Sequence, residues 1–282
     1  MTKNRDLDYY FQKAHNIEGW FDLEAARIIN ELNNFQRMTD LEGDIFEIGV
    51  HHGRMTVFLG LLLDDDEQIG VCDIFEDQIH NISRSGGGSR SKFLETWNHY
   101  FGNKRQVRIF EMPSQNLSVA DTGSNCRIFS IDGGHTAAET FQDLRTGFAA
   151  IRADGIVLID DYFDPMYPGV SEGVNRFLMD TQEVTPLLYF FNKLLLLNHD
   201  HRTKYEKYIV GPQFETFLHQ RRLQINCQKF HDRDLYILSQ STRGQLIFKW
   251  IRRMIPDFIV SSAFFQSRGP KNIYSRLIKP RK

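Results

Sequence analysis

Short apolar runs alternate with longer amphipathic segments through the first 160 residues or so of the chain. Five of these runs have the length and the β-branched content of buried strands. They cover residues 44–50, 69–73, 106–110, 126–132 and 155–161. Apolar residues recur at helical spacing between them, most clearly over residues 54–63 and 137–151. Because strands that alternate with helices are typical of βαβ units, the pattern predicts an α/β fold with a mostly parallel sheet.

The pattern changes on both sides of these five runs. Residues 1–40 have helical spacing, with Asp22 placed to cap a helix, so we expect a helical N-terminal extension. After the fifth run, apolar stretches over 187–197 and 235–238 predict two further strands, which makes seven in the sheet. The central domain is therefore expected to span residues 41–242.

Residues 243–282 differ in composition from the rest of the chain. They contain ten Lys and Arg residues and a single acid, Asp257, interleaved with aromatic and aliphatic residues. One interpretation is a helix packed on the domain with a solvated basic face, and the other is a weak contact with a membrane surface or a protein partner. Both interpretations predict a basic amphipathic C-terminal tail.

Composition narrows the class of protein. Hydrophobic residues make up 41% of the chain and charged residues 25%, with a net charge of −2, which gives no indication of a nucleic-acid partner. The cysteines, Cys72, Cys126 and Cys227, show no C-x-x-C spacing, which argues against a zinc site or a disulfide framework. Since the sequence shows neither a secretory signal nor a bilayer-spanning stretch, we expect a soluble cytoplasmic protein. We also expect a homo-oligomer, with a dimer as the preferred state.

Polar residues concentrate where the first two predicted strands end. Ligands of open parallel sheets bind beyond the carboxyl ends of the strands. Glu47, Gly49 and Gly53 follow one another at the end of the first strand, where glycines let the backbone pass close to a ligand. Asp73 ends the second strand, where a carboxylate can accept hydrogen bonds from ribose hydroxyls. His51 takes the place of the middle glycine of a dinucleotide fingerprint, so no diphosphate-binding pattern remains. Glu47, just before the turn, suits a ligand with a cationic amino group better than a pyrophosphate.

Three further carboxylates are expected in one small volume. Asp132 ends the fourth strand, and Asp160 and Asp161 end the fifth, which we expect to be its neighbour. Such a cluster is unfavourable unless a cation or a proton offsets the repulsion, and an all-oxygen set suits Mg²⁺, with Mn²⁺ or Ca²⁺ as alternatives. In the alternative interpretation, Asp160 and Asp161 cap the loop that follows them, which leaves Asp132 unexplained.

Three histidines lie near these carboxyl ends. His135 follows Asp132 on an Asp-Gly-Gly-His turn, whose glycines let the imidazole point towards the carboxylates. Histidine is suited to accept a proton near neutral pH, so we expect His135 to be a general base, with a helix-capping or core-edge histidine as the alternative. Of His51 and His52, we expect one to line a cofactor pocket and the other to lie on the surface.

Taken together, these motifs resemble those of class I S-adenosylmethionine-dependent methyltransferases. Within that class they are most similar to the metal-dependent sugar O-methyltransferases of macrolide and aminocoumarin biosynthesis, the macrocin and mycinamicin type. The resemblance covers roughly residues 40–200, and its strongest elements are Asp132-Gly-Gly-His135 and Asp160-Asp-Tyr162.

The resemblance implies a Rossmann-like fold and a role for each site residue. S-adenosylmethionine would contact Glu47, Gly49, Gly53, Asp73 and Asp132, with Ser114 near the adenine. Mg²⁺, or Mn²⁺, would be bound by Asp132, Asp160 and Asp161, and His135 would be the general base.

We therefore expect an enzyme that transfers a methyl group from S-adenosylmethionine to a metal-bound hydroxyl of a small molecule, a sugar or a glycosylated metabolite. Loops 81–91 and 163–169 flank the site as candidate lids. Lys193, after Asn192, is interpreted as structural, with a contact to the acceptor as the alternative. Two alternatives remain. A nicotinamide-dependent oxidoreductase on a related sheet would be distinguished by its cofactor, and a non-catalytic binding protein of methyltransferase fold by its lack of turnover.

Overall fold

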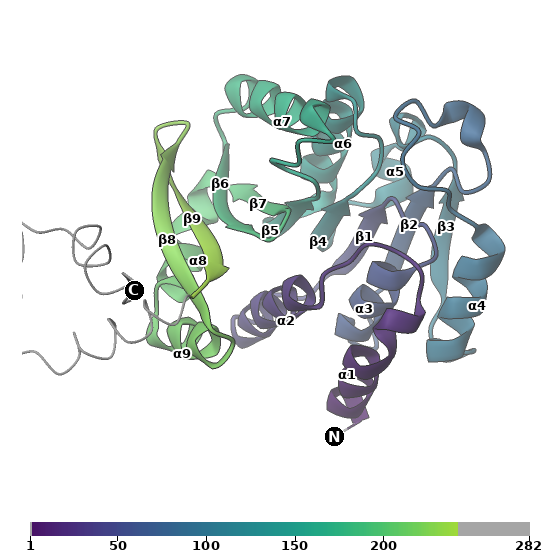
Figure 1. Ribbon diagram of the computed structural model, residues 1–282, viewed down its shortest axis with the longest axis horizontal. Helices are drawn as coiled ribbons and strands as arrows, with labels where there is room; N and C mark the ends of the chain where they lie inside the picture. Colours follow the sequence, from purple (N-terminus) through teal and green to yellow (C-terminus); the bar gives the residue numbers. More distant parts are fainter. Residues whose placement is uncertain (1, 242–282) are drawn as a thin grey trace, which may run out of the picture.

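The computed structural model describes residues 2–241, and the basic tail expected over 243–282 lies outside the described residues. A single sheet of nine strands, in the order β3-β2-β1-β4-β5-β7-β6-β9-β8, runs through the middle of the molecule (Figure 1). Its first five strands are parallel. They are β1 (Asp44–Ile48), β2 (Ile69–Asp73), β3 (Val107–Glu111), β4 (Cys126–Ile131) and β5 (Ile151–Ile159). The expected α/β fold with a mostly parallel sheet is confirmed.

Within residues 2–241 the sheet has nine strands and not the expected seven. The apolar run 187–197 folds as two antiparallel strands, β6 (Val184–Phe190) and β7 (Lys193–Asn198), because the chain reverses at Phe191, whose φ is +55°. The run is apolar throughout because both strands are buried, so its composition does not mark the reversal.

The other unexpected strand is β8 (Leu223–Phe230). It pairs with β9 (Arg233–Gln240) across a two-residue turn, at His231 and Asp232, whose φ angles are +47° and +58°. Its residues are largely exposed, and its sequence therefore lacks the apolar pattern that would have predicted a strand.

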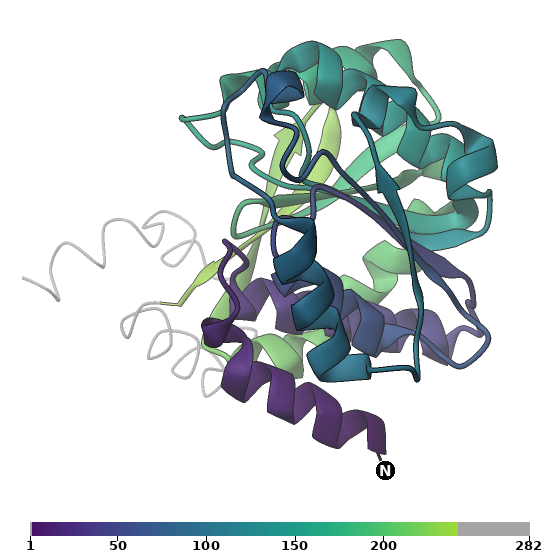
Figure 2. The same cartoon turned by 90° about the vertical axis from the view of Figure 1, so that its right-hand side faces the viewer.

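Helices cover both faces of the sheet (Figures 1 and 2). One face carries α1 (Thr2–Lys13), α2 (Leu23–Met38), α3 (Arg54–Leu62), α4 (Arg90–Phe101), α8 (Arg202–Ile209) and α9 (Pro212–Gln220). The other carries α5 (Val119–Thr122), α6 (Ala137–Ala150) and α7 (Pro168–Asp180). Within residues 2–241, no helix is both long enough and apolar enough to cross a membrane.

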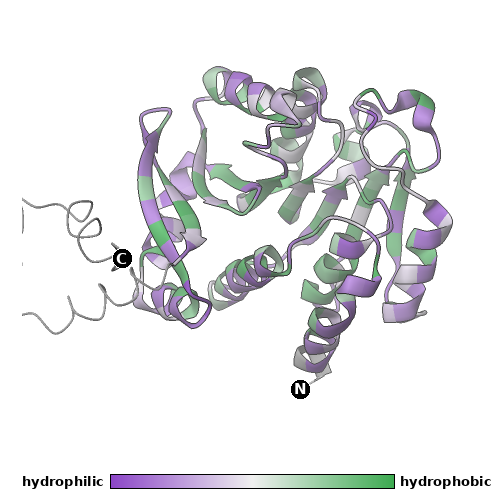
Figure 3. Ribbon diagram, in the orientation of Figure 1, coloured by the Kyte–Doolittle hydropathy of each residue, from purple (hydrophilic) through white to green (hydrophobic). Residues whose placement is uncertain are grey.

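The two faces of the sheet have separate apolar cores. Successive strand residues alternate between them, so that Ile45 and Ile128 face the α2 and α3 side, whereas Phe46 and Phe129 face the α6 and α7 side. Figure 3 shows the strands as the apolar middle layer between helices with polar outer surfaces. Burial of apolar surface between the sheet and the helices, at roughly 25 cal/mol per Å², is the main contribution to the stability of the three layers.

The sheet topology determines where a site can form. β1 lies between β2 and β4, so the connections that leave β1 and β4 diverge, and a crevice opens beyond the carboxyl ends of these strands. Hydrogen bonds continue past the strand ends: Asp132 N–H donates to Ile48 C=O at 2.8 Å, and Asp160 N–H donates to Ile131 C=O at 2.9 Å. These bonds hold the ends of β1, β4 and β5 side by side.

Candidate active site

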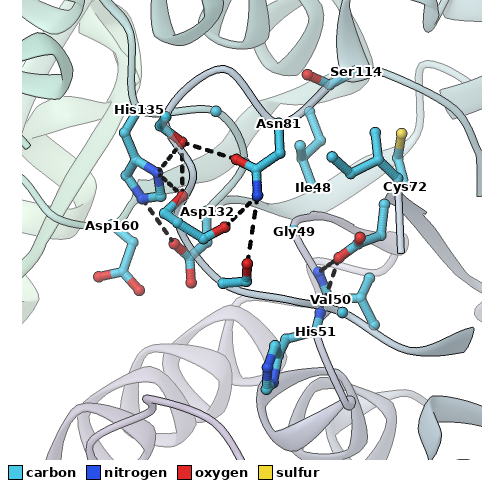
Figure 4. Close-up of a pocket in the computed structure, with 18 of the residues that line it drawn as sticks. Ile48, Gly49, Val50, His51, Cys72, Asn81, Ser114, Asp132, His135 and Asp160 are labelled. Carbon is cyan, nitrogen blue, oxygen red and sulfur yellow. Dashed lines mark hydrogen bonds and ion pairs between the residues drawn. The ribbon is translucent and has the colours of Figure 1, made fainter. Parts of the chain in front are cut away.

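A cavity of about 440 Å³ lies at this edge of the sheet (Figure 4). Its volume is in the range of small-molecule sites. All but one of the expected site residues line it: Glu47, Gly49, Asp73, Ser114, Asp132, His135, Asp160 and Asp161. Gly53 is the exception.

The turn after β1 depends on Gly49 and Asp73. Gly49 has a φ of +85°, and a Cβ atom there would lie 1.8 Å from the carbonyl oxygen of Asp132, so only glycine fits. The Asp73 carboxylate accepts hydrogen bonds from the backbone N–H groups of Val50 and His51, at 2.5 and 2.9 Å (Figure 4). Asp73 therefore fixes the turn and also presents its carboxylate to the cavity.

Gly53 is required for packing at the start of α3. Its φ is +85°, and a Cβ atom there would lie 2.6 Å from the ring of Phe93. His51 lines the cavity, as expected for one of the two histidines in this turn. The expectation that the other lies on the surface is wrong, because His52 is buried with its ring stacked on that of His51.

Glu47 is a buried carboxyl group at the floor of the cavity. Only 1% of the residue is exposed, and its carboxylate accepts a hydrogen bond from the Thr56 hydroxyl. Burial raises the pKa of Glu47 to about 8. A cationic group bound in the cavity would favour the ionised form, so Glu47 is suited to a ligand with an ammonium group.

Asp160 and Asp161 are adjacent in the chain but have different partners. Asp160 forms a buried ion pair with Lys193 on β7 and accepts a hydrogen bond from the backbone N–H of Asp161 at 2.9 Å. Its contacts are those of the capping interpretation. Asp161 has a φ of +55°, a conformation that costs non-glycine residues on the order of 1–3 kcal/mol and is typical of functional positions. Its carboxylate accepts a hydrogen bond from Asn192 Nδ2 at 2.9 Å and lies 3.1 Å from His135 Nε2.

The carboxylates of this cluster differ in pKa. Burial, together with the charge of Asp160, raises the pKa of Asp132 well above its usual range. Burial acts in the same direction on Asp161, but hydrogen bonds with His135 and Asn192 outweigh it and lower the pKa of Asp161. Lys193 offsets only one of the three negative charges, so the ionised cluster carries an excess of negative charge that a divalent cation would neutralise.

His135 connects this cluster to the loop between β2 and α4. Its Nε2 atom lies 3.1 Å from Asp161 and 3.8 Å from Asp132, and its ring stacks on Tyr167 with centroids 4.0 Å apart. On the other side of the ring, Nδ1 lies 2.8 Å from the hydroxyl oxygen of Ser85. The imidazole is thus oriented with Nε2 towards the carboxylates.

The chemistry of these donors fits a hard divalent cation. Among residues 2–241, one group of side chains offers ligand atoms within 4.8 Å of one another: Asp132, His135 and Asp161. This group differs from the expected trio because the Asp160 carboxylate faces Lys193. Lys193, interpreted from the sequence as structural, supplies a counter-charge to Asp160, and its position directly after the turn residue Asn192 is the one signal for that role in the sequence.

Comparisons with known proteins concern this same part of the chain. Residues 46–162 match a protein family described as a methyltransferase domain. No curated protein matches the chain. The solved structure of the O-methyltransferase NovP superposes with a TM-score of 0.54 and 16% identity, over 62% of this chain and 79% of that one. CalS11, a calicheamicin methyltransferase, gives 0.48 and 16%, over 63% and 79%. The methyltransferase PaMTH1 of Podospora anserina, solved with S-adenosylhomocysteine (SAH), gives 0.45 and 17%, over 68% and 86%.

The matched segment lies within the part of the fold that forms the cavity. The described domain has the Rossmann-like fold found in class I methyltransferases. The matched segment contains the turn after β1 and the carboxylates that follow β4 and β5.

Proposed function

We propose that the protein is an S-adenosylmethionine-dependent O-methyltransferase that methylates a hydroxyl group of a small molecule beside a divalent cation. The observation that carries the proposal is that one cavity holds two sets of groups. A glycine turn and acids suited to the donor follow β1 and β2, and carboxylates with a histidine follow β4 and β5.

The donor half of the cavity supports S-adenosylmethionine over a dinucleotide. Glu47 would bind the ammonium group of the methionine part, and Asp73 would accept hydrogen bonds from the ribose hydroxyls. Gly49 lets the ligand approach the backbone, and Ser114, which is buried at the cavity wall, would lie near the adenine. Gly53 would act on the donor only through the start of α3.

The acceptor half supports a cation-assisted reaction. Asp132 and Asp161, with Asp160 beside them, would hold Mg²⁺ or Mn²⁺, which as a Lewis acid would lower the pKa of an acceptor hydroxyl. His135 would take the hydroxyl proton at Nε2. The acceptor oxygen would then attack the methyl carbon of the donor, and the methyl–sulfur bond would break to leave S-adenosylhomocysteine.

We infer that the acceptor is a sugar or a glycosylated metabolite. Two neighbouring hydroxyls, such as those of a sugar ring, can reach the same carboxylate cluster. The O-methyltransferase NovP has the same fold, but at 16% identity its likeness supports the fold and not the acceptor.

Transfer of labelled methyl groups tests the proposal. Purified protein is incubated with methyl-labelled S-adenosylmethionine and a panel of sugars and glycosides, with Mg²⁺ or with EDTA. We expect labelled product only with Mg²⁺. Bound S-adenosylmethionine without product would favour the non-catalytic binding protein. In a parallel incubation with NADH in place of S-adenosylmethionine, hydride transfer would favour the oxidoreductase.

A further inference from the structure

The segment from Gln78 to Gly88 joins β2 to α4 and is not explained by the donor and acceptor sites alone. Most of its residues line the cavity. Burial of apolar side chains does not hold it in place, since Ile79 and Ile82 are 92% and 69% exposed. Polar contacts must therefore determine its position.

Internal hydrogen bonds shape this loop, and close packing at one end holds it against the donor turn. Asn81 Nδ2 donates to the carbonyl oxygen of Ser85 at 2.8 Å and contacts the Gln78 side chain at 2.7 Å. At the other end, Gly88 packs so closely that a Cβ atom would lie 3.2 Å from the Asp73 carboxylate and 3.5 Å from the Cα atom of His51. The loop is thus tied to the donor turn.

Between Asn81 and Gly88 the loop presents two serine hydroxyls to His135. Ser85 Oγ lies 2.8 Å from His135 Nδ1, and Ser83 Oγ lies 2.7 Å from Ser85 Oγ and 3.4 Å from the same ring nitrogen. Ser83 Oγ also lies 3.4 Å from Asn81 Oδ1, and Figure 4 shows Asn81 and His135 on the same side of the cavity. Both serines are half-buried.

We infer that Ser85 is a positioning residue for His135, an inference that rests on the proposed role of His135 as the base. Stacking on Tyr167 fixes the plane of the imidazole but does not distinguish its two flipped orientations, since a half-turn about the Cβ–Cγ bond keeps the plane and exchanges each nitrogen with a carbon. The hydrogen bond to Ser85 excludes the flipped ring and keeps Nε2 directed at Asp161. A hydroxyl both donates and accepts, so Ser85 can partner Nδ1 whichever ring nitrogen carries the proton.

This contact gives the loop a role in the reaction. The loop is anchored beside Asp73 on the donor side and holds the base on the acceptor side, so its placement aligns His135 with the donor. Loss of the Ser85 hydroxyl is expected to slow methyl transfer without weakening donor binding.

The test compares Ser85→Thr with Ser85→Val, a pair of equal size that differs in the hydroxyl group. The ring nitrogens of His135 are followed by NMR in protein labelled with ¹⁵N-histidine, and their resonances are identified by their loss in His135→Gln. We expect Ser85→Val to move the Nδ1 resonance and to lower the transfer rate about 10- to 100-fold, the usual effect of losing an orienting partner. Ser85→Thr is expected to restore both.

Ser91→Ala is the control, because Ser91 is exposed at the start of α4 and contacts Ser89 and not His135. The inference is overturned if Ser85→Val leaves the His135 resonances unchanged, or if it moves them while transfer keeps its wild-type rate. If the wild-type protein does not bind S-adenosylmethionine, the proposed function fails, and the NMR comparison still decides whether Ser85 orients the ring.

Discussion

Asp161 is the residue at which the different parts of the site meet. It adopts a left-handed backbone conformation, accepts a hydrogen bond from Asn192, and contacts the imidazole of His135. A strained conformation persists only where its surroundings enforce it, and here it directs the carboxylate into the cavity.

We predict that Asp161→Asn abolishes metal-dependent turnover and leaves the affinity for S-adenosylmethionine nearly unchanged. The amide keeps the size of the side chain but removes the charge that a cation requires. Turnover against Mg²⁺ concentration and calorimetric titration of the donor measure the two effects. Asp180→Asn, an exposed change at the end of α7, is the control. Full activity in Asp161→Asn would rule out a cation site at this carboxylate.

Replacement of His135 distinguishes between two roles for this residue, a general base and a ligand of the cation. If His135 is the base, His135→Gln lowers kcat about 10²- to 10⁴-fold, and the Mg²⁺ concentration for half-maximal activity stays the same. The measurement is kcat at a series of Mg²⁺ concentrations. A large rise in the Mg²⁺ requirement would instead assign His135 to the cation, as the spacing of Asp132, His135 and Asp161 also allows.

At the scale of single elements, the local sequence predicted helix caps and helix bounds correctly. Asp22 was expected to cap a helix, and its carboxylate accepts hydrogen bonds from the backbone N–H groups of Glu24 and Ala25 at the start of α2. The expected helices over 54–63 and 137–151 are α3 and α6, within one residue at each end.

We predict that Asp22→Ala destabilises the protein by about 1 kcal/mol, the usual cost of losing a helix cap. Asp22→Asn retains the acceptor oxygen and should lose less. Urea denaturation followed by circular dichroism measures the difference. Equal stability of the alanine variant and the wild type would mean that α2 does not depend on this cap.

The two hairpins were missed because their signals are not local. The reversal at Phe191 lies within an apolar run that reads as one strand, and β8 is an exposed edge strand without alternation. In both cases pairing with a neighbouring strand determines the structure, and the sequence of one segment does not identify the strand with which it pairs.

The same distinction applies to the site. Residues that end strands, such as Asp73, Asp132 and Asp161, could be predicted because strand ends of a parallel sheet converge. The contacts of Lys193 and Ser85 with the site could not be predicted. Lys193 lies on an antiparallel strand, and Ser85 lies on a loop whose conformation does not follow from a sequence pattern. The local sequence contains the chemistry of these residues but not their position.

At the scale of the molecule, a buried ion cluster joins elements far apart in sequence. Glu67 accepts hydrogen bonds from Arg37 of α2 and from Arg127 of β4, and also from the backbone N–H of Gly43. Burial acts to raise the pKa of Glu67, but the two guanidinium groups outweigh it and lower the pKa to about 2. Removal of one partner would leave buried charges uncompensated.

We predict that Glu67→Gln destabilises the protein by about 3 kcal/mol at neutral pH. Because the pKa of Glu67 is lower in the folded state than in the unfolded chain, the ionised carboxylate stabilises the fold above about pH 4. That contribution is lost as the pH falls from about 4 towards 2. Urea denaturation across this range should show a smaller loss of stability in Glu67→Gln than in the wild type. Glu95→Gln, an exposed change on α4, is the control, and equal pH dependence of Glu67→Gln and wild type would contradict the account.

The central claim is that the cavity at the ends of β1 to β5 binds S-adenosylmethionine. Calorimetric titration of S-adenosylmethionine, and separately of NADH, into the purified protein with Mg²⁺ or with EDTA tests it most directly. We predict binding of S-adenosylmethionine with a Kd in the micromolar range, which corresponds to a binding free energy of about −8 kcal/mol. We predict no binding of NADH. Binding of NADH alone, or no binding of S-adenosylmethionine in either buffer, would contradict the account.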